Sequence, residues 1–326
     1  MEIVEEASSK DAAIVGSLLG TAVGDALGLP YEGLSRRRGA KLFGEPDRYR
    51  LLPGRGMVSD DTEHACMVAQ AVIDAGDDAE AFAEHLARRL RWWLLALPAG
   101  TGLATLKATL KLCIGISPDR SGIFSAGNGP AMRSPILGAA IDDLDQLRRF
   151  VRASTRITHT DLKAEYGAWG VALAARRASS RTLMEPRDYA SELSQSLAGE
   201  PADEFLDLVD RAVRSHERGE SVEAFADSLG LEKGVSGYVY HTVLVVLHAW
   251  FSYPGDFRSA VQSVIRCGGD TDSTAAIVGG IVGCTVSKAG IPQEWLDHLW
   301  EWPRSVTWLE HLGKILAASR STGQPE

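Results

Sequence analysis

The chain has 326 residues, of which 45% are hydrophobic and 24% are charged, as in globular proteins rather than disordered or fibrous ones. Its net charge of −9 argues against nonspecific binding to nucleic acid or to an anionic membrane surface. The N-terminus is acidic, unlike a signal peptide, and no apolar run reaches the length of a membrane span. The four cysteines lack the C-x-x-C spacing of metal or redox sites. We therefore expect a cytoplasmic monomer with no membrane partner.

The first predicted helix, 12–29, carries a stripe of glycines at four-residue spacing. The stripe consists of Gly16, Gly20, Gly24 and Gly28, which lie on one helix face. Each glycine costs about 1 kcal/mol of helix stability relative to alanine, so the stripe predicts close backbone packing against another helix. Residues 275–283 carry a matching Ala-Gly-Gly stripe and are the predicted partner. Asp25, next to Gly24, is either a carboxylate near a ligand site or a buried structural one.

The segment after this helix is rich in Gly, Pro and Arg and predicts a long loop of about 25 residues. Connections of that length are uncommon unless they carry function. One interpretation is a lid that carries Glu32, and the alternative is a plain solvated loop.

The rest of the chain predicts helices and no strands. Ala, Leu and Gly recur at helical spacing over 61–75, 79–97 and 102–112, and polar amphipathic helices over 175–232 are expected to form an outer shell. No segment shows the alternation of a strand or an Asn-Gly hairpin. No linker divides the chain. We therefore predict an all-α fold with a single domain over 1–326, a core at about 12–315 and frayed termini.

Two clusters of acidic and hydroxyl residues each open an apolar helix. One is Ser59-Asp60-Asp61-Thr62, and the other is Gly268-Gly269-Asp270-Thr271-Asp272-Ser273. A single cluster of this kind would be an ordinary helix cap. Two such clusters at opposite ends of the chain favour a shared site for hard divalent cations, which prefer oxygen ligands. Carboxylates crowded in this way would also repel one another unless cations neutralised them.

A third segment, 125–133, contains Gly127-Asn128-Gly129 and leads into a helix. Small residues with free N–H groups at a helix start suit a phosphate group, although Gly-Asn-Gly is also common in turns. His159 follows in a Thr158-His159 pair. A single histidine of this kind is more often a structural hydrogen-bonding residue than a functional one.

Together these segments resemble the ADP-ribosylglycohydrolase family over residues 16–290. The matching pieces, in the family's order, are Gly20–Gly28, Ser59–Thr62, Gly127–Gly129 with Met132-Arg133, Thr158-His159 and Gly268–Ser273. The resemblance implies an orthogonal helical bundle that holds two Mg²⁺ or Mn²⁺ ions, a dinuclear metal site, in a central cleft. It also implies a hydrolase that releases ADP-ribose from an ADP-ribosylated protein or a small ADP-ribosyl substrate.

The resemblance assigns roles to individual residues. The implied metal ligands are Ser59, Asp60, Asp61, Asp270, Asp272 and Ser273. The implied substrate-binding residues are Gly102, Ser125, Gly127, Asn128, Gly129, Met132, His159 and Tyr238. Glu32 matches an acidic residue on a mobile loop over the metals. Ser59 and Ser273 replace the family's usual threonines, and both keep the hydroxyl group.

Hydrolysis of a ribose glycosidic bond passes through an oxocarbenium-like state, and divalent ions can activate the attacking water. Glu32, Asp61 and Asp272 are the candidate catalytic carboxylates that would move the proton. One alternative is a catalytically silent relative that only binds ADP-ribose. Another is an all-α Mg²⁺-dependent isoprenoid diphosphate enzyme, whose acidic motif resembles 60–63. Such enzymes pair that motif with a spaced glutamate that 270–273 lacks.

Overall fold

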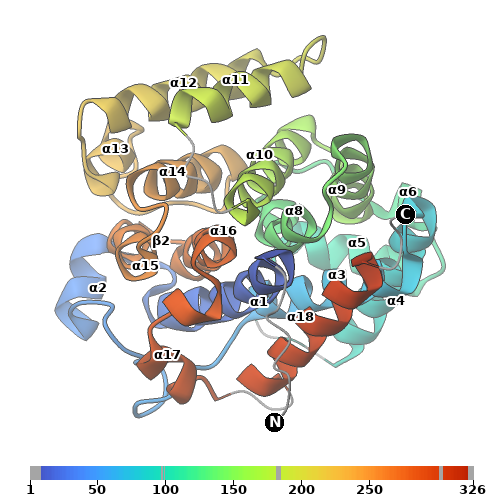
Figure 1. Cartoon of the computed structure of the whole chain (residues 1–326), viewed down its shortest axis with the longest axis horizontal. Helices are drawn as coiled ribbons and strands as arrows, with labels where there is room; N and C mark the ends of the chain where they lie inside the picture. The colour runs from blue at the N-terminus through green and yellow to red at the C-terminus, as the bar shows by residue number, and fades with distance from the viewer. Residues whose placement is uncertain (1–8, 97, 99, 181–184, 301–303, 322–326) are drawn as a thin grey trace.

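The computed structural model describes residues 9–96, 98, 100–180, 185–300 and 304–321, and these are helical for the most part (Figure 1). The elements are α1 (Ser9–Gly28), the 3₁₀ helix η1 (Leu29–Tyr31), β1 (Leu34–Ser35), α2 (Arg36–Phe43), α3 (Asp60–Ala75), α4 (Ala79–Leu95), α5 (Leu103–Cys113), α6 (Pro118–Ser121), α7 (Gly129–Met132), α8 (Pro135–Ala140), α9 (Leu144–Thr158), α10 (Leu162–Ser179), α11 (Pro186–Ser196), α12 (Asp203–Glu217), α13 (Val222–Ser228), α14 (Val239–Ser252), α15 (Phe257–Arg266), β2 (Gly268–Gly269), α16 (Thr271–Gly290), α17 (Gln293–His298) and α18 (Val306–Ser321). The all-α prediction is confirmed.

Helices α1 and α16 pack side by side at the centre of the molecule (Figure 1). Their glycine stripes face each other, as the spacing predicts. A methyl group added at Gly20 would overlap the carbonyl oxygen of Gly279, and one at Gly24 would overlap that of Ala275. The two backbones therefore touch directly, and this contact places the N-terminus of α16 beside the C-terminus of α1.

Gly20→Ala is expected to destabilise the protein, although alanine favours an isolated helix by about 1 kcal/mol. The added methyl group would overlap backbone atoms of Gly279 and come within 3.1 Å of Phe257 Cε2, so the two central helices would have to separate. We expect the free energy of unfolding in urea to fall by about 1–3 kcal/mol. Gly255→Ala is the control, because a methyl group there meets no atom within 4 Å. Unchanged stability of Gly20→Ala would contradict the direct helix contact.

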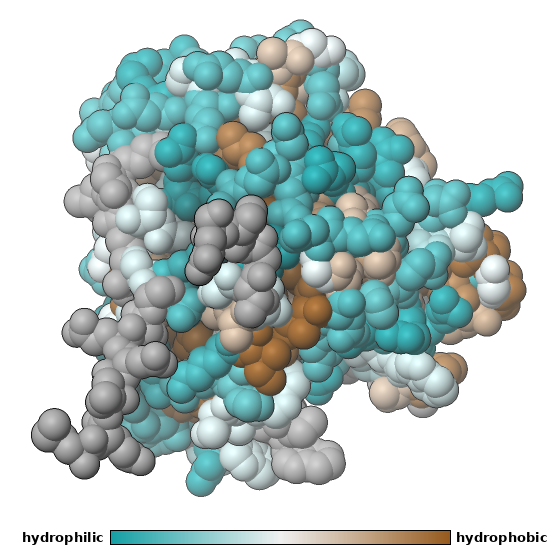
Figure 2. Space-filling model, turned by 45° about the vertical axis from the view of Figure 1, so that its right-hand side comes forward, coloured by the Kyte–Doolittle hydropathy of each residue, from teal (hydrophilic) through white to brown (hydrophobic). Residues whose placement is uncertain are grey.

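The buried hydrophobic side chains form one cluster that extends from α1 to α18. Helices α11, α12 and α13 lie at one edge of the molecule, beyond α14 and α10 (Figure 1), in the region where an outer shell is predicted. The face shown in Figure 2 is mostly hydrophilic, with small separate hydrophobic areas.

The segment Ser9–Tyr31 is long and apolar enough to cross a membrane by length and composition alone, so the prediction that no apolar run reaches that length is wrong. In the folded protein, 89% of its most apolar window is buried. This burial is what the core helix α1 requires for its packing against α16.

The predicted loop after Gly33 is more ordered than expected, because it contains β1 and α2. Strand β1 pairs antiparallel with β2, with Leu34 opposite Gly269. The prediction that the chain has no strands is therefore wrong at this point. Strands of two residues are too short to show an alternating pattern. The pairing requires Gly268 and Gly269, whose φ angles of 71° and 83° few other residues adopt.

Candidate active site

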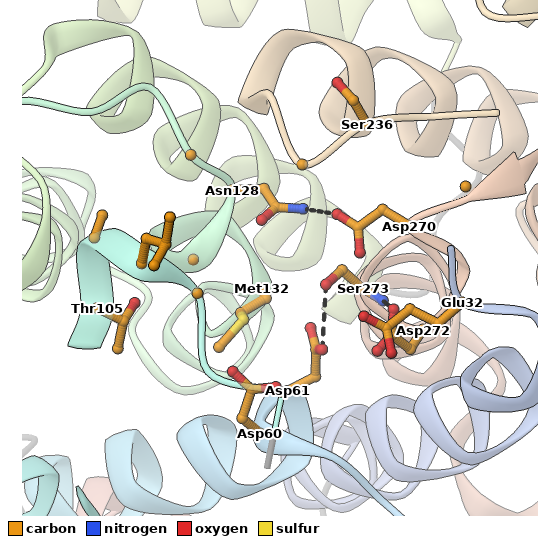
Figure 3. A pocket seen from close by; sticks show the side chains of 18 of the residues that line it. Glu32, Asp60, Asp61, Thr105, Asn128, Met132, Ser236, Asp270, Asp272 and Ser273 are labelled. Atoms are coloured by element: carbon orange, nitrogen blue, oxygen red, sulfur yellow. Dashed lines mark hydrogen bonds between the residues drawn. The ribbon is translucent and has the colours of Figure 1, made fainter. Parts of the chain in front are cut away.

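A cleft of about 560 Å³ opens where the N-termini of α3, α5, α7 and α16 meet. Figure 3 shows the acidic side chains of α3 and α16 pointing toward one another across it. The predicted residues that line the cleft are Glu32, Asp60, Asp61, Gly102, Ser125, Gly127, Asn128, Gly129, Met132, His159, Asp270, Asp272 and Ser273. Ser59 and Tyr238 are not among the lining residues. The two acidic clusters, distant in sequence, therefore meet in one cavity.

Asp61 is the point at which the two clusters touch. Its Oδ2 atom accepts a hydrogen bond from Ser273 Oγ at 3.2 Å and one from Ser59 Oγ at 3.3 Å. Its side chain is almost fully buried, and its other oxygen, Oδ1, has no hydrogen-bond partner within the described residues. Ser59 is thus close to the site through Asp61, and one buried carboxylate oxygen remains available to a ligand.

Asp25 holds the turn that presents Asp60 and Asp61. Its carboxylate is fully buried and accepts hydrogen bonds from the Ser59 N–H group at 2.9 Å, the Thr62 N–H group at 3.1 Å and the Thr62 hydroxyl. Of the two interpretations from the sequence, Asp25 is the buried structural carboxylate. It fixes the first acidic cluster to α1, the helix that packs against α16.

The carboxylates of the cleft carry raised pKa values. Burial, reinforced by repulsion from neighbouring carboxylates, raises the pKa of Asp60 to about 7 and moves those of Asp61 and Asp272 well above the usual range. Burial also raises the pKa of Asp270, and partial desolvation with repulsion from Asp270 raises that of Glu32. None of the salt bridges within the described ranges involves these five carboxylates.

These donors fit a hard divalent cation chemically. They offer carboxylate and hydroxyl oxygens, and Oδ1 of Asp61 is buried and has no hydrogen-bond partner among the described residues. In the part of the chain that the structure describes, no three His, Cys, Asp or Glu side chains already stand in ligating geometry. The hydroxyls of Ser59 and Ser273 instead occupy one oxygen of Asp61.

The metal-free protein is expected to lose thermal stability between about pH 4 and pH 7. Burial raises the pKa of Asp25 to about 6 and that of Asp60 to about 7 in the folded state. A carboxyl group whose pKa is raised in the folded state stabilises the fold while it is protonated. This stabilisation is complete below the pKa of the unfolded chain, about 3.8, and is lost as the pH rises through the pKa of the folded state. Melting in EDTA should therefore show a Tm that falls from about pH 4 to about pH 7, and Mg²⁺ should offset the fall at pH 8. A Tm that rises over this interval would contradict it.

The Gly127-Asn128-Gly129 loop is joined to the second acidic cluster. Asn128 Nδ2 donates to Asp270 Oδ2 at 2.6 Å and to Thr242 Oγ1 at 3.0 Å, and the Asn128 N–H group donates to the Gly237 carbonyl at 3.0 Å. Asn128 therefore holds the side chain of Asp270 in place. The sequence did not predict this contact.

Two predicted substrate residues adjoin this loop. His159 lines the cleft beneath the two glycines, where a methyl group on Gly127 would come within 2.9 Å of its Nε2 atom. Tyr238 pairs with Gly127 through a backbone bridge, but its hydroxyl contacts Lys163 Nζ at 3.2 Å. Tyr238 therefore adjoins the cleft without lining it.

Thr105 and Ser236 line the cleft and were not predicted. Thr105 belongs to the first turn of α5, where only Gly102 was singled out, and nothing in the local pattern marks it. Ser236 precedes Gly237 and the predicted Tyr238, so the Gly-x-Ser-Gly turn at 234–237 was a signal that could have identified it.

The fold and the cleft define an all-α protein with an oxygen-lined acidic site beside a glycine-rich loop. The ADP-ribosylglycohydrolase family model matches residues 6–326, and the chain belongs to this family. Its relatives include hydrolases that cleave the glycosidic bond of ADP-ribose, and the protein is an enzyme of this kind.

Two relatives and one solved structure illustrate the similarity. An uncharacterized protein of Archaeoglobus fulgidus is 32% identical over 295 residues, covering 86% of this chain and 90% of that protein. The ADP-ribosyl-[dinitrogen reductase] glycohydrolase of Rhodospirillum rubrum is 28% identical over 299 residues, covering 87% and 89%. A structure titled ADP-ribosylglycohydrolase-related protein complex superposes with a TM-score of 0.72 at 26% identity, covering 96% and 99%.

Proposed function

We propose that the protein hydrolyses the bond between ADP-ribose and a modified protein side chain, with two Mg²⁺ or Mn²⁺ ions as cofactors. The observation that carries the proposal is the meeting of both acidic clusters and the Gly-Asn-Gly loop in one cleft, on the fold of this family. A protein acceptor is supported by the name of the Rhodospirillum rubrum relative, which identifies ADP-ribosylated dinitrogen reductase as its substrate.

The residues that would hold the ions are Asp60, Asp61, Asp270 and Asp272, with the hydroxyls of Ser59 and Ser273. When bound, divalent ions supply Lewis acidity and lower the pKa of a water molecule. Hydrogen bonds from Asn128 to Asp270 and from Ser273 to Asp61 keep these side chains directed into the cleft. The carboxylate of Asp25 accepts a hydrogen bond from the Ser59 N–H group and so keeps the turn at Ser59 in place.

The remaining residues divide the cleft into two parts. The backbone of 125–129 and the ring of His159 border one part, which suits the diphosphate and the distal ribose. Glu32 borders the other part, next to Asp270 and Asp272 (Figure 3). Partial burial and the charge of Asp270 raise the pKa of Glu32, which makes its carboxylate a stronger base, so Glu32 can accept a proton from water and return it to the leaving group.

The test is release of ADP-ribose from defined ADP-ribosylated substrates with Mg²⁺, Mn²⁺ or EDTA. A panel of arginine-linked, serine-linked and small-molecule substrates would identify the acceptor. Metal-dependent release from at least one protein substrate is expected. Binding of ADP-ribose with no release from any substrate would instead favour a silent relative, and release of diphosphate from an isoprenoid diphosphate would favour the other alternative.

A further inference from the structure

A buried arginine behind the cleft has no place in the mechanism above. Arg133 is fully buried, and its Nε atom donates to Ser154 Oγ at 2.9 Å. Its Nη2 atom donates to the Ser154 carbonyl and to Thr158 Oγ1, both at 2.7 Å, and Nη1 lies 3.3 Å from His64 Nδ1. No carboxylate pairs with it within the described ranges. Burial of a guanidinium group without a paired carboxylate costs free energy of folding, which raises the question of what the contacts of Arg133 do for the site.

The contact with Thr158 determines where the proton of that hydroxyl points. Thr158 Oγ1 accepts from Arg133, and its own proton has two acceptors within reach. The Thr155 carbonyl lies at 3.5 Å, whereas Nδ1 of His159 lies at 2.9 Å. The shorter distance favours Nδ1. The positive charge of Arg133 also favours a lone pair, rather than an N–H group, at Nδ1 of His159.

This hydrogen bond fixes the other side of the imidazole. A neutral histidine has one N–H group, so a ring that accepts at Nδ1 must carry its proton on Nε2. Burial, reinforced by the charge of Arg133, lowers the pKa of His159 to about 3, so the ring is neutral at physiological pH. The Nε2 atom lies on the side of Gly127 and Gly129, and no hydrogen bond to it forms among the described residues.

We propose that Arg133 is a positioning residue that acts through Thr158 to hold His159 as the neutral Nε2–H tautomer. The cleft then presents a fixed, uncharged donor for an acceptor oxygen of the ligand. The identity of that ligand as ADP-ribose rests on the proposed function, whereas the tautomer does not. Arg133 thus contributes to binding although it does not touch the cleft.

The experiment uses protein labelled with ¹⁵N at histidine, because the shifts of the two ring nitrogens distinguish the tautomers by NMR. In the ligand-free parent, His159 should show the Nε2–H pattern. Thr158→Val keeps the side-chain shape and removes the hydroxyl, so the ring should change to a mixture of tautomers. The Kd for ADP-ribose should rise about three- to tenfold, as for the loss of one hydrogen bond. Binding of Mg²⁺ alone should be unchanged.

Two further variants are controls for packing. Thr158→Ser keeps the hydroxyl group, so both the tautomer of His159 and the affinity for ADP-ribose should match those of the parent. Thr155→Val removes a neighbouring buried hydroxyl whose one hydrogen bond among the described residues is to the Val151 carbonyl, so it should leave the ring shifts of His159 unchanged. If Arg133→Gln does not fold, the Thr158 series still decides the question.

An Nδ1–H pattern in the parent protein would overturn the proposal. So would Thr158→Val with unchanged ring shifts and unchanged affinity. Failure of the proposed function looks different, because the parent would then release no ADP-ribose, whether or not it bound it, while His159 still showed the Nε2–H pattern.

Discussion

Asp272→Ala is expected to abolish hydrolysis and to leave the metal-free protein at least as stable as the parent. Asp272 is 5% exposed, and burial with repulsion from Asp270 and Glu32 raises its pKa. Its hydrogen bond within the site comes from the adjacent Ser273 N–H group at 2.9 Å. Removal of this carboxylate therefore relieves repulsion in a crowded acidic cluster without breaking a long-range contact. The Tm in EDTA should stay level or rise.

Addition of Mg²⁺ distinguishes the effect of Asp272→Ala on the stability of the metal-free protein from its effect on metal binding. Ligand that binds only the native state raises Tm by mass action, so the parent should be stabilised and Asp272→Ala should not. If the protein holds the two ions proposed above, loss of Asp272 should weaken the binding of both, because Asp272 lies between the proposed ligands Asp270 and Ser273 at the start of α16. Ser273→Ala is the matched variant, and it should weaken only one of the two ions. Calorimetry that shows two Mg²⁺ ions still bound to Asp272→Ala would contradict this role of Asp272.

The central helix pair could be predicted from the sequence because the signal is local and periodic. Glycines at four-residue spacing destabilise a helix unless another backbone lies against them, and the contacts of Gly20 and Gly24 with α16 show that compensation. The β1–β2 pair could not be predicted. It joins Leu34 to Gly269 through backbone hydrogen bonds, which leave no pattern of side chains along either segment.

The meeting of the two acidic clusters could be predicted for a different reason, because each cluster contains more carboxylates than an ordinary helix cap needs. The residues that hold the site together were harder to assign. Asp25 could equally have been a ligand, and its role depends on donors from Ser59 and Thr62, more than thirty residues away. The contact of Asn128 with Asp270 spans 142 positions. Such roles are set by three-dimensional packing, which one sequence does not display.

Glu32→Gln is expected to lower kcat about 10²–10⁴-fold, the usual contribution of a positioned acid–base group, while KM and Tm change little. The backbone around Glu32 is anchored independently of its side chain. The Gly33 N–H group donates to the Gly269 carbonyl at 2.8 Å, and Leu34 pairs with Gly269. The side chain of Glu32 itself is exposed and lines the cleft beside Asp272 (Figure 3). A neutral amide should therefore leave the fold and the ligand site intact and remove only the proton transfer.

The matched control is Glu45→Gln, on the same segment beyond α2. Glu45 is exposed and forms a surface ion pair with Arg266 at 2.8 Å, which contributes about 1 kcal/mol at most. Because Glu45 lies on the same segment as Glu32 but does not line the cleft, Glu45→Gln should leave kcat unchanged. Single-turnover release of ADP-ribose, measured beside the melting temperature, separates the two variants. If Glu32→Gln turned over at the parent rate, the carboxylate that moves the proton would have to be Asp61 or Asp272 instead.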